Sequence, residues 1–230
     1  MNDLLLLFDI DGTLLHVAEE IAFVRAFQDL YGDGVDVSWP EATTASDTSF
    51  VAAVIARATG CTATDAQVAE VLARFVAHLE QTVVSGLTPV QAVAGAKEFV
   101  MQCAASASVA IATGCVEPSA RVKLRHAQLD DHFPCGGFSA RETRRAEIVE
   151  RAIAAAQRHY GRRFAPVDVV SFGDRSWDIE AARELGLRFV GINRSRRGRD
   201  QLRRDGATVV LSDFTDPAAI WNAIGTLRRG

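Results

Sequence analysis

The chain has 230 residues, of which 48% are hydrophobic and 23% charged, and its formal net charge is −4. These values are typical of a soluble globular protein with one sizeable core, or with one domain that carries a smaller inserted one. The mildly acidic balance disfavours nucleic acid as a partner, because binding to the phosphate backbone needs a basic surface.

The sequence contains neither a candidate membrane-spanning segment nor a CxxC zinc-binding motif. The first apolar run has no basic region before it and is interrupted by Asp9, and no later stretch approaches the roughly eighteen uncharged residues that span a bilayer. We therefore expect a cytoplasmic protein with no membrane partner. The cysteines are widely spaced without a CxxC pair, which predicts reduced thiols rather than a zinc site or a disulfide framework; they are Cys61, Cys103, Cys115 and Cys135.

The first predicted element is a strand over residues 4–8, LLLLF, whose unbroken apolar character indicates burial on both faces. Asp9 and Asp11 follow at once, and side chains two apart in an extended chain point the same way. Gly12 then permits a sharp turn beside them. Buried carboxylates cost several kcal/mol each unless they find a partner, so this stretch requires one.

The interval from residue 16 to residue 86 is predicted to contain only helices. It holds apolar stripes with the i, i+3, i+4 spacing of helices that pack on one face. The stripes are Phe23, Phe27, Leu30 and Tyr31, then Phe50, Val51, Val54, Ile55 and Ala58, and then Val68, Val71, Leu72, Phe75, Val76 and Leu79. We expect an all-helical insertion between the first strand and the rest of the chain.

Short apolar runs resume after the insertion and alternate with helical patterns. The runs cover residues 109–112, 167–172, 189–192 and 209–211, and helices are expected over residues 144–159 and 177–185. Strands that alternate with helices predict a doubly wound α/β fold with a parallel sheet.

Polar residues follow three of these strands. Thr113 and Gly114 offer a hydroxyl and an open backbone amide after the run over residues 109–112. Asp174 and Asp178 follow the run over residues 167–172. The carboxyl ends of strands in an open α/β sheet are where ligands bind, so these groups should meet the aspartates of the first strand. Clustered carboxylates of this kind need a cation and suit Mg²⁺.

A basic segment lies at the start of the predicted helix over residues 144–159. It supplies Arg141, Arg144 and Arg145, any of which could contribute the positive charge of an anion site. Only two of the 25 basic residues are lysines, Lys97 and Lys123. We assign Lys123 to the helix PSARVKLRH rather than to the site.

The ordered motifs DIDGT, TG, a basic residue at a helix start and GDxxxD resemble those of the haloacid dehalogenase-like (HAD) hydrolases. The helical insertion resembles that family's C1 cap. The resemblance spans nearly the whole chain and implies a core formed by residues 1–15 and 87–230, with a cap formed by residues 16–86.

The resemblance also implies roles for individual residues. Asp9 would be the nucleophile and Asp11 the general acid and base, while Thr113 would bind phosphoryl oxygens. Mg²⁺ would be held by Asp9, by the backbone carbonyl of Asp11, and by Asp174 and Asp178. Arg145 best fits the third motif, where the family usually has lysine, and Arg144 is the alternative.

Other positions stay open at this stage. Gly12, Gly114 and Thr48 are candidate substrate-binding positions. The cap loop with Thr44, Ser46, Asp47 and Thr48 could face the substrate, but Ser46 or Asp47 could equally cap the helix that starts near Ser49. Cys115 stands where asparagine is usual in the motif, which we interpret as a local substitution.

Among the family's activities, a Mg²⁺-dependent hydrolase of small organic phosphate monoesters, of the phosphoglycolate phosphatase type, fits best. Dehalogenases of the family lack the second aspartate, and phosphonoacetaldehyde hydrolases need a cap lysine that is not present. A β-phosphoglucomutase-like mutase keeps the same motifs and remains an alternative. A phospho-accepting binding module that does not turn over is a third hypothesis, from a different class.

Overall fold

A computed structural model describes residues 3–39, 46–140 and 144–227 of the chain. The strands are β1 (Leu5–Phe8), β2 (Leu15–Val17), β3 (Val90–Ala92), β4 (Ser108–Ala112), β5 (Gly136–Gly137), β6 (Val169–Gly173), β7 (Arg188–Ile192) and β8 (Val210–Leu211). The α-helices are α1 (Glu20–Tyr31), α2 (Asp47–Thr59), α3 (Asp65–Val84), α4 (Ala96–Ser106), α5 (Glu117–His126), α6 (Arg145–Tyr160), α7 (Ser176–Glu184), α8 (Arg196–Arg204) and α9 (Pro217–Leu227), with 3₁₀ turns at Asp130–His132 and Pro166–Asp168.

The main sheet has six strands in the order β5-β4-β1-β6-β7-β8, and every neighbouring pair is parallel. The predicted doubly wound parallel α/β fold is therefore confirmed. Strand β1 lies in the centre, between β4 and β6, where the order of the strands along the chain switches sides. The carboxyl ends of these three strands consequently border one crevice.

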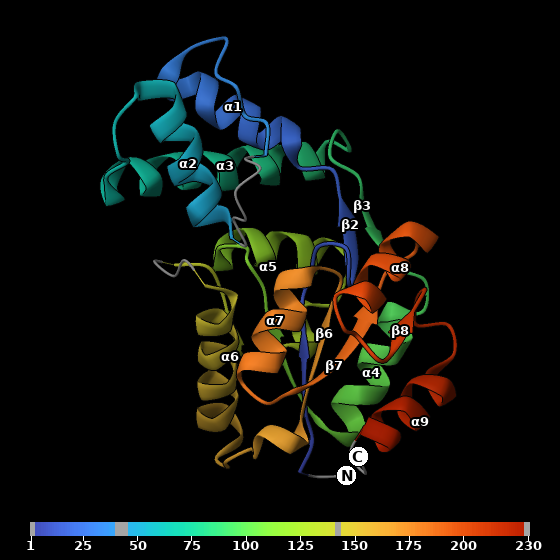
Figure 1. Ribbon diagram of the computed structural model, residues 1–230. Helices are drawn as coiled ribbons and strands as arrows, with labels where there is room; N and C mark the ends of the chain where they lie inside the picture. The colour runs from blue at the N-terminus through green and yellow to red at the C-terminus, as the bar shows by residue number, and fades with distance from the viewer. Residues whose placement is uncertain (1–2, 40–45, 141–143, 228–230) are drawn as a thin grey trace.

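Strand β1 is buried on both faces, as its apolar run predicts. Leu6 and Phe8 belong to a core under α4 and α9, whereas Leu5 and Leu7 belong to a second core under α6 and α7 (Figure 1). Phe8 stacks on Phe172 of β6 with ring centroids 4.6 Å apart. This packing fixes the end of β1, where the acidic motif begins.

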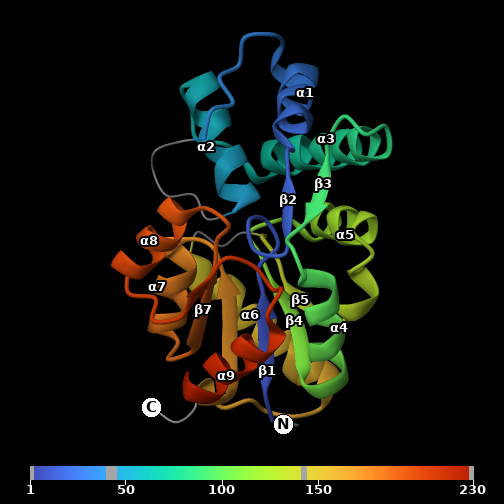
Figure 2. The same ribbon diagram turned by 90° about the vertical axis from the view of Figure 1, so that its right-hand side faces the viewer.

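Helices α1, α2 and α3 form a separate layer beyond the carboxyl ends of the sheet (Figures 1 and 2). They enclose a hydrophobic core of their own, which includes Phe23, Phe27, Phe50 and Phe75. The antiparallel strands β2 and β3 connect this layer to the main body.

Some local predictions are wrong. Residues 16 and 17 belong to β2, so the interval from 16 to 86 is not helical throughout; β2 forms only because β3, far along the chain, pairs with it. Ala58, expected on the buried face of α2, is exposed because it lies in the helix's last turn. The strand predicted from residue 167 begins at Val169, after a 3₁₀ turn that starts at Pro166.

Within the described ranges, no helix is both long enough and apolar enough to cross a lipid bilayer.

Candidate active site

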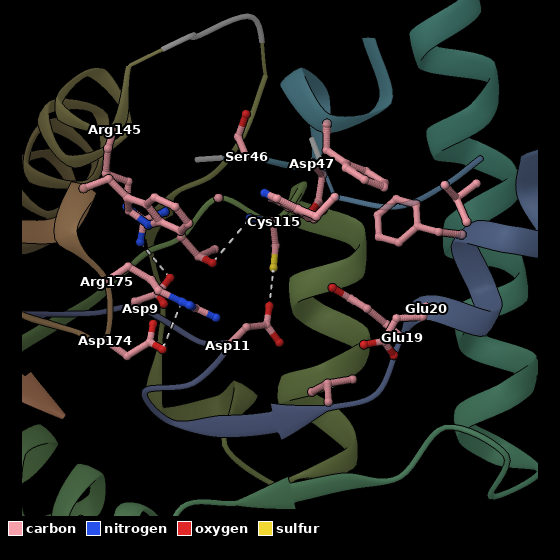
Figure 3. Close-up of a pocket in the computed structure, with 18 of the residues that line it drawn as sticks. Asp9, Asp11, Glu19, Glu20, Ser46, Asp47, Cys115, Arg145, Asp174 and Arg175 are labelled. Carbon is pink, nitrogen blue, oxygen red and sulfur yellow. Dashed lines mark hydrogen bonds and ion pairs between the residues drawn. The ribbon is translucent and has the colours of Figure 1, made fainter. Parts of the chain in front are cut away.

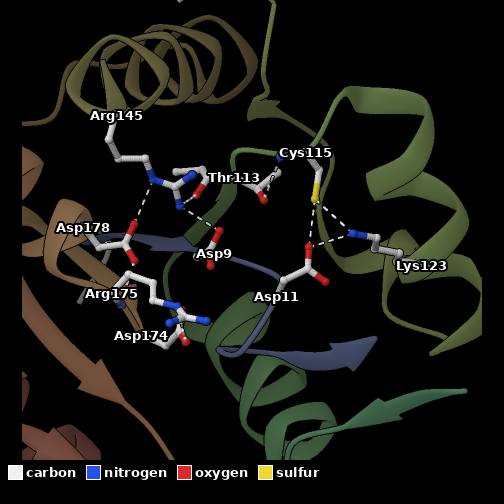
Figure 4. A network of polar contacts seen from close by, with 10 residues as sticks. Asp9, Asp11, Thr113, Cys115, Lys123, Arg145, Asp174, Arg175 and Asp178 are labelled. Carbon is white, nitrogen blue, oxygen red and sulfur yellow. Dashed lines mark hydrogen bonds and ion pairs between the residues drawn. The ribbon is translucent and has the colours of Figure 1, made fainter. Parts of the chain in front are cut away.

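Three strand ends deliver the polar side chains of the candidate site. Asp9 directly follows β1 and its backbone N–H donates to the carbonyl of Phe172 over 3.0 Å. Thr113 follows β4, and Asp174 follows β6. Asp9, Thr113 and Asp174 are all buried and gather at one end of the sheet (Figure 4).

Arg145, the first residue of α6, joins this group from the side. Its Nη2 donates to Asp9 Oδ1 over 2.7 Å and to the carbonyl of Ala112 over 2.9 Å, while its Nε donates to Asp178 Oδ1 over 2.8 Å. Burial lowers the pKa of Arg145, but the charges of Asp178 and Asp9 outweigh it and raise this pKa overall. Arg144 points elsewhere and pairs with Glu184, so Arg145 is the arginine that contacts the acidic motif. Arg141 lies outside the described residues.

Asp11 has a different environment from Asp9. Its Oδ2 accepts a hydrogen bond from Lys123 Nζ over 2.7 Å and one from Cys115 Sγ over 2.9 Å. Its Oδ1 is buried without a hydrogen-bond partner among the described residues. Burial, and then the charge of Asp11, raise the pKa of the Cys115 thiol well above its ordinary value. Cys115 therefore acts as a neutral donor to Asp11 rather than as a reactive thiolate.

Lys123 is fully buried and also lies 2.6 Å from Glu19 Oε2, at the start of α1. Burial lowers its pKa, yet Asp11 and the other acidic groups around it raise that pKa well above the ordinary value. Burial raises the pKa of Glu19 to about 8, against the opposing effect of Lys123. Lys123 thus links the main body to the helical layer.

Lys123 lies in the helix predicted for it, α5, but its contacts with Asp11 and Glu19 were not predicted from the sequence. Ser119 and Ala120, one turn earlier, and Leu124 are buried on the same helix. A lysine on a helix face of small and apolar residues, in a chain whose other basic groups are nearly all arginines, was the available signal.

A pocket of about 720 Å³ opens beside these groups, between the sheet and the helical layer (Figure 3). This volume suits a small-molecule ligand. The pocket is lined by Asp9, Asp11, Val17, Glu19, Glu20, Phe23, Val37, Ser38, Trp39, Ser46, Asp47, Phe50, Thr113, Gly114, Cys115, Arg145, Asp174, Arg175 and Trp177.

Two of the candidate substrate-binding positions are not among these lining residues. Thr48 forms a 2.5 Å hydrogen bond with Ser139 Oγ, which places its hydroxyl on a link between α2 and the main body. Gly12 has a φ of +87°, and a Cβ there would overlap the carboxyl group of Asp174. Gly12 therefore leaves room for Asp174, and Gly114 is the member of the three that lines the pocket.

Ser46 and Asp47 could either cap the helix that starts near Ser49 or face the substrate. Ser46 is the N-cap of α2 and accepts from the backbone N–H of Ser49 over 3.3 Å. Asp47 instead reaches the main body, where its Oδ2 accepts from the backbone N–H of Val116 over 3.0 Å. Both residues also line the pocket. Thr44 lies outside the described residues.

The comparison with protein families identifies the chain. The model of the haloacid dehalogenase-like hydrolases matches residues 4–186. The chain belongs to this family. The match covers β1, the helical layer and the polar ends of β4 and β6. The protein is therefore an enzyme, a HAD-like hydrolase, and residues of its motifs line the pocket.

Solved structures share the fold of this HAD-like hydrolase. A β-phosphoglucomutase from Clostridium difficile is 14% identical with a TM-score of 0.69, and 98% of each chain is covered. CbbY from Rhodobacter sphaeroides in complex with phosphate is 21% identical with a TM-score of 0.67, covering 94% of this chain and 96% of that one. A predicted phosphoglycolate phosphatase from Haemophilus somnus is 17% identical with a TM-score of 0.63, covering 96% and 98%. None of the curated proteins is a significant sequence match.

The acidic cluster of the HAD-like hydrolase fits a divalent cation. One carboxylate oxygen each from Asp9, Asp174 and Asp178 lies within 4.8 Å of the other two. Asp174 Oδ1 is buried without a hydrogen-bond donor among the described residues. Burial, and then the charges of Asp9 and Asp178, raise the pKa of Asp174 well above its ordinary value. Arg145 contacts Asp9 and Asp178, and Arg175 Nε lies 3.3 Å from Asp174 Oδ2, but two guanidinium groups do not balance three carboxylates. Hard oxygen donors with a remaining excess of negative charge match the requirements of Mg²⁺.

The buried position of Lys123 gives a stability prediction. Lys123→Met should lower the free energy of unfolding by about 3 kcal/mol, because it leaves Asp11 and Glu19 without their shared cation. Urea denaturation measures this loss. Lys97→Met is the matched control, since Lys97 Nζ donates to Gln128 Oε1 in an exposed position and has no ion pair among the described residues. The loss of this exposed contact should cost less than about 1 kcal/mol. Equal losses in the two variants would contradict a structural role for the Lys123 contacts.

Proposed function

We propose that the protein is a Mg²⁺-dependent phosphatase of small organic phosphate monoesters that works through an aspartyl-phosphate on Asp9. The observation that carries this proposal is the buried group at the ends of β1 and β6, where Arg145 and two further carboxylates surround Asp9 beside an open pocket. A nucleophilic carboxylate next to fixed positive charge suits attack on an anionic phosphoryl group.

The reaction would proceed in two steps on this chain's residues. A carboxylate oxygen of Asp9 attacks phosphorus, and the ester oxygen leaves with a proton from Asp11. Asp11 then takes a proton from water, whose oxygen attacks phosphorus and releases inorganic phosphate from Asp9. One carboxyl group can serve both steps because its protonation state alternates between them.

The surrounding groups would orient these steps. Arg145 holds Asp9 Oδ1, and Lys123 with Cys115 holds Asp11 Oδ2, so each carboxyl group keeps one constrained oxygen. The Thr113 hydroxyl, at the end of β4 and in the pocket wall, would donate to a phosphoryl oxygen.

Asp9, Asp174 and Asp178, with the backbone carbonyl of Asp11, would hold Mg²⁺. When bound, the ion would neutralise charge on Asp9 and on the phosphoryl oxygens.

The helical layer would act as a cap. We propose that residues 16–86 form this cap over a core of residues 1–15 and 87–230, with β2 and β3 as the connection. Closure would exclude water while Asp9 attacks and would let the cap's inner surface select the alcohol part of the ester. A cytoplasmic location and a small phosphorylated metabolite as the partner belong to the same proposal.

Phosphate release by the purified protein tests this function. The panel comprises p-nitrophenyl phosphate, phosphoglycolate, sugar phosphates and nucleotides, each with Mg²⁺ or with excess chelator. We expect release with Mg²⁺, a fall of at least about 100-fold with chelator, and recovery when Mg²⁺ is restored. Isomerisation of a sugar phosphate without release would instead indicate a mutase. Stable phosphorylation without turnover would indicate a binding module, and no reaction at all would contradict the proposed function.

A further inference from the structure

The pocket has two ends of different chemistry. Asp9, Asp174, Arg145 and Arg175 gather at one end, whereas Glu19 and Glu20 lie at the opposite side, with Asp11 between (Figure 3). The first end would take the phosphoryl group under the proposed function. The second end, which the cap contributes, would therefore contact the alcohol part of the ester.

Negative charge dominates the cap end. Glu19, Glu20 and Asp47 line it, and Asp11 adjoins them. Lys123 is the cation that contacts this group, and it already serves both Asp11 and Glu19. Glu20 is exposed in the pocket wall and has no ion pair or hydrogen bond among the described residues. Burial keeps Glu19 largely protonated at neutral pH, since its pKa is about 8. The negative charge that Lys123 leaves uncompensated therefore lies mainly on the exposed carboxylate of Glu20.

Aromatic rings form the neighbouring wall. Phe23 and Phe50 meet edge to face with centroids 4.9 Å apart, and Trp39 stacks on Phe50 at 4.6 Å. Trp39 is 52% exposed although its indole is large and apolar. Phe23 also stacks on Phe75 with centroids 3.7 Å apart, and both Phe23 and Phe50 are buried, so the exposed indole of Trp39 is the ring most available to a ligand. An indole beside carboxylates attracts cations, because its ring face is electron-rich.

The arginines of the cap lie outside the pocket wall. Residues 16–86 contain no lysine, and their arginines are Arg25, Arg57 and Arg74. Arg57 donates to the backbone carbonyl of Ser38 over 2.8 Å, and Arg74 lies 3.7 Å from Asp29. None of these arginines, all within the described ranges, lines the pocket. Among the described residues, the cap end therefore offers a carboxylate or a second phosphate on the substrate no cation besides Lys123, which already contacts Asp11 and Glu19.

We infer that the substrates are phosphate monoesters of amino alcohols, in which an alkylammonium group lies between the cap carboxylates and the aromatic wall. This inference rests on the proposed function and narrows its substrate class. It also predicts that phosphoglycolate, whose carboxylate would face Glu19 and Glu20, is a poor substrate.

Matched pairs of esters isolate the effect of the charge. Phosphocholine is compared with 3,3-dimethylbutyl phosphate, its neutral carbon isostere, and phosphoethanolamine with propyl phosphate. We expect kcat/KM to be about tenfold higher for the cationic member of at least one pair, and phosphoglycolate to be slower than both members of that pair. p-Nitrophenyl phosphate reports whether phosphatase activity is present at all.

Glu20→Gln tests the cap carboxylates directly. This variant should reduce the ratio of kcat/KM for the cationic ester to that for its isostere by about threefold, mainly through KM. Glu70→Gln is the matched control: it removes the same charge from an exposed position on α3 outside the pocket, and should leave the ratio unchanged. Thermal unfolding of both variants shows whether each remains folded.

The outcomes separate the inference from the proposed function. Equal rates within both pairs, a preference for the neutral esters, or a preference for phosphoglycolate would overturn the inference and leave the phosphatase intact. The same ratio change in Glu20→Gln and Glu70→Gln would also overturn it, because the effect would then be one of overall charge. Failure to hydrolyse any ester, p-nitrophenyl phosphate included, would overturn the proposed function and the inference together.

Discussion

Asp9→Asn is expected to reduce phosphate release by at least about 10⁴-fold, because an amide oxygen cannot form the acyl-phosphate bond. The substitution preserves size, and an amide oxygen can still accept from Arg145 Nη2, which lies 2.7 Å from Asp9 Oδ1. Steady-state release of phosphate in the presence of Mg²⁺ measures the loss.

The fold of this variant should survive. The Asp9→Asn substitution removes one negative charge from a buried cluster that also holds Asp174 and Asp178, so the midpoint of thermal unfolding should not fall. A variant with wild-type activity would show that Asp9 is not the nucleophile. Loss of activity together with unfolding would be uninformative, and the thermal midpoint distinguishes that case.

Asp11→Asn is expected to act selectively. The loss in kcat should reach about 10²–10⁴-fold for alkyl phosphates, whose poor leaving groups need protonation, and should be much smaller for p-nitrophenyl phosphate during the first step. Pre-steady-state measurement of p-nitrophenol release separates that step from the hydrolysis of the aspartyl-phosphate, which Asp11 also serves.

Cys115→Ala is the control for Asp11. It removes the 2.9 Å contact of Cys115 Sγ with Asp11 Oδ2 but keeps the carboxyl group and the contact from Lys123. The loss in kcat that Cys115→Ala causes should be smaller than that of Asp11→Asn, and similar for alkyl phosphates and p-nitrophenyl phosphate. Should Asp11→Asn slow alkyl and aryl esters equally in the first step, Asp11 would not be the acid that protonates the leaving group.

The family, the fold class and the principal acidic residues could all be predicted from the sequence. Each motif is a short run next to a strand, and Asp9 and Asp174 needed only the rule that parallel strands end at one edge. Asp178 needed the helix spacing as well, because it lies four residues after Asp174 in the first turn of α7. The run RAEIV, which opens an amphipathic helix as in the family's third motif, favoured Arg145 over Arg144, and α6 does begin at Arg145. The catalytic roles of these residues stay predictions until the variants are measured.

Several features depended on partners far away in the chain. Strand β2 exists because β3 pairs with it, although Leu15 and Ala92 are widely separated in sequence. Thr48 was expected near substrate, yet its hydroxyl bonds Ser139, a residue whose approach no local pattern announces. Ser46 and Asp47 could not be assigned between capping and pocket from the sequence, because Ser46 does both and Asp47 lines the pocket while it contacts the main body.

The strands, the strand-end motifs and the family are readable from local order, because burial on two faces and sharp turns each leave a signature within a few residues. The cation at Asp11 and the character of the cap end were decided only by tertiary packing. Lys123 reaches Asp11 and Glu19 from α5, and α1 and α2 bring Glu20, Phe23 and Phe50 to one pocket wall. Electrostatic balance in a buried site depends on distances of a few ångströms between distant segments, and those distances arise from the packing of whole helices.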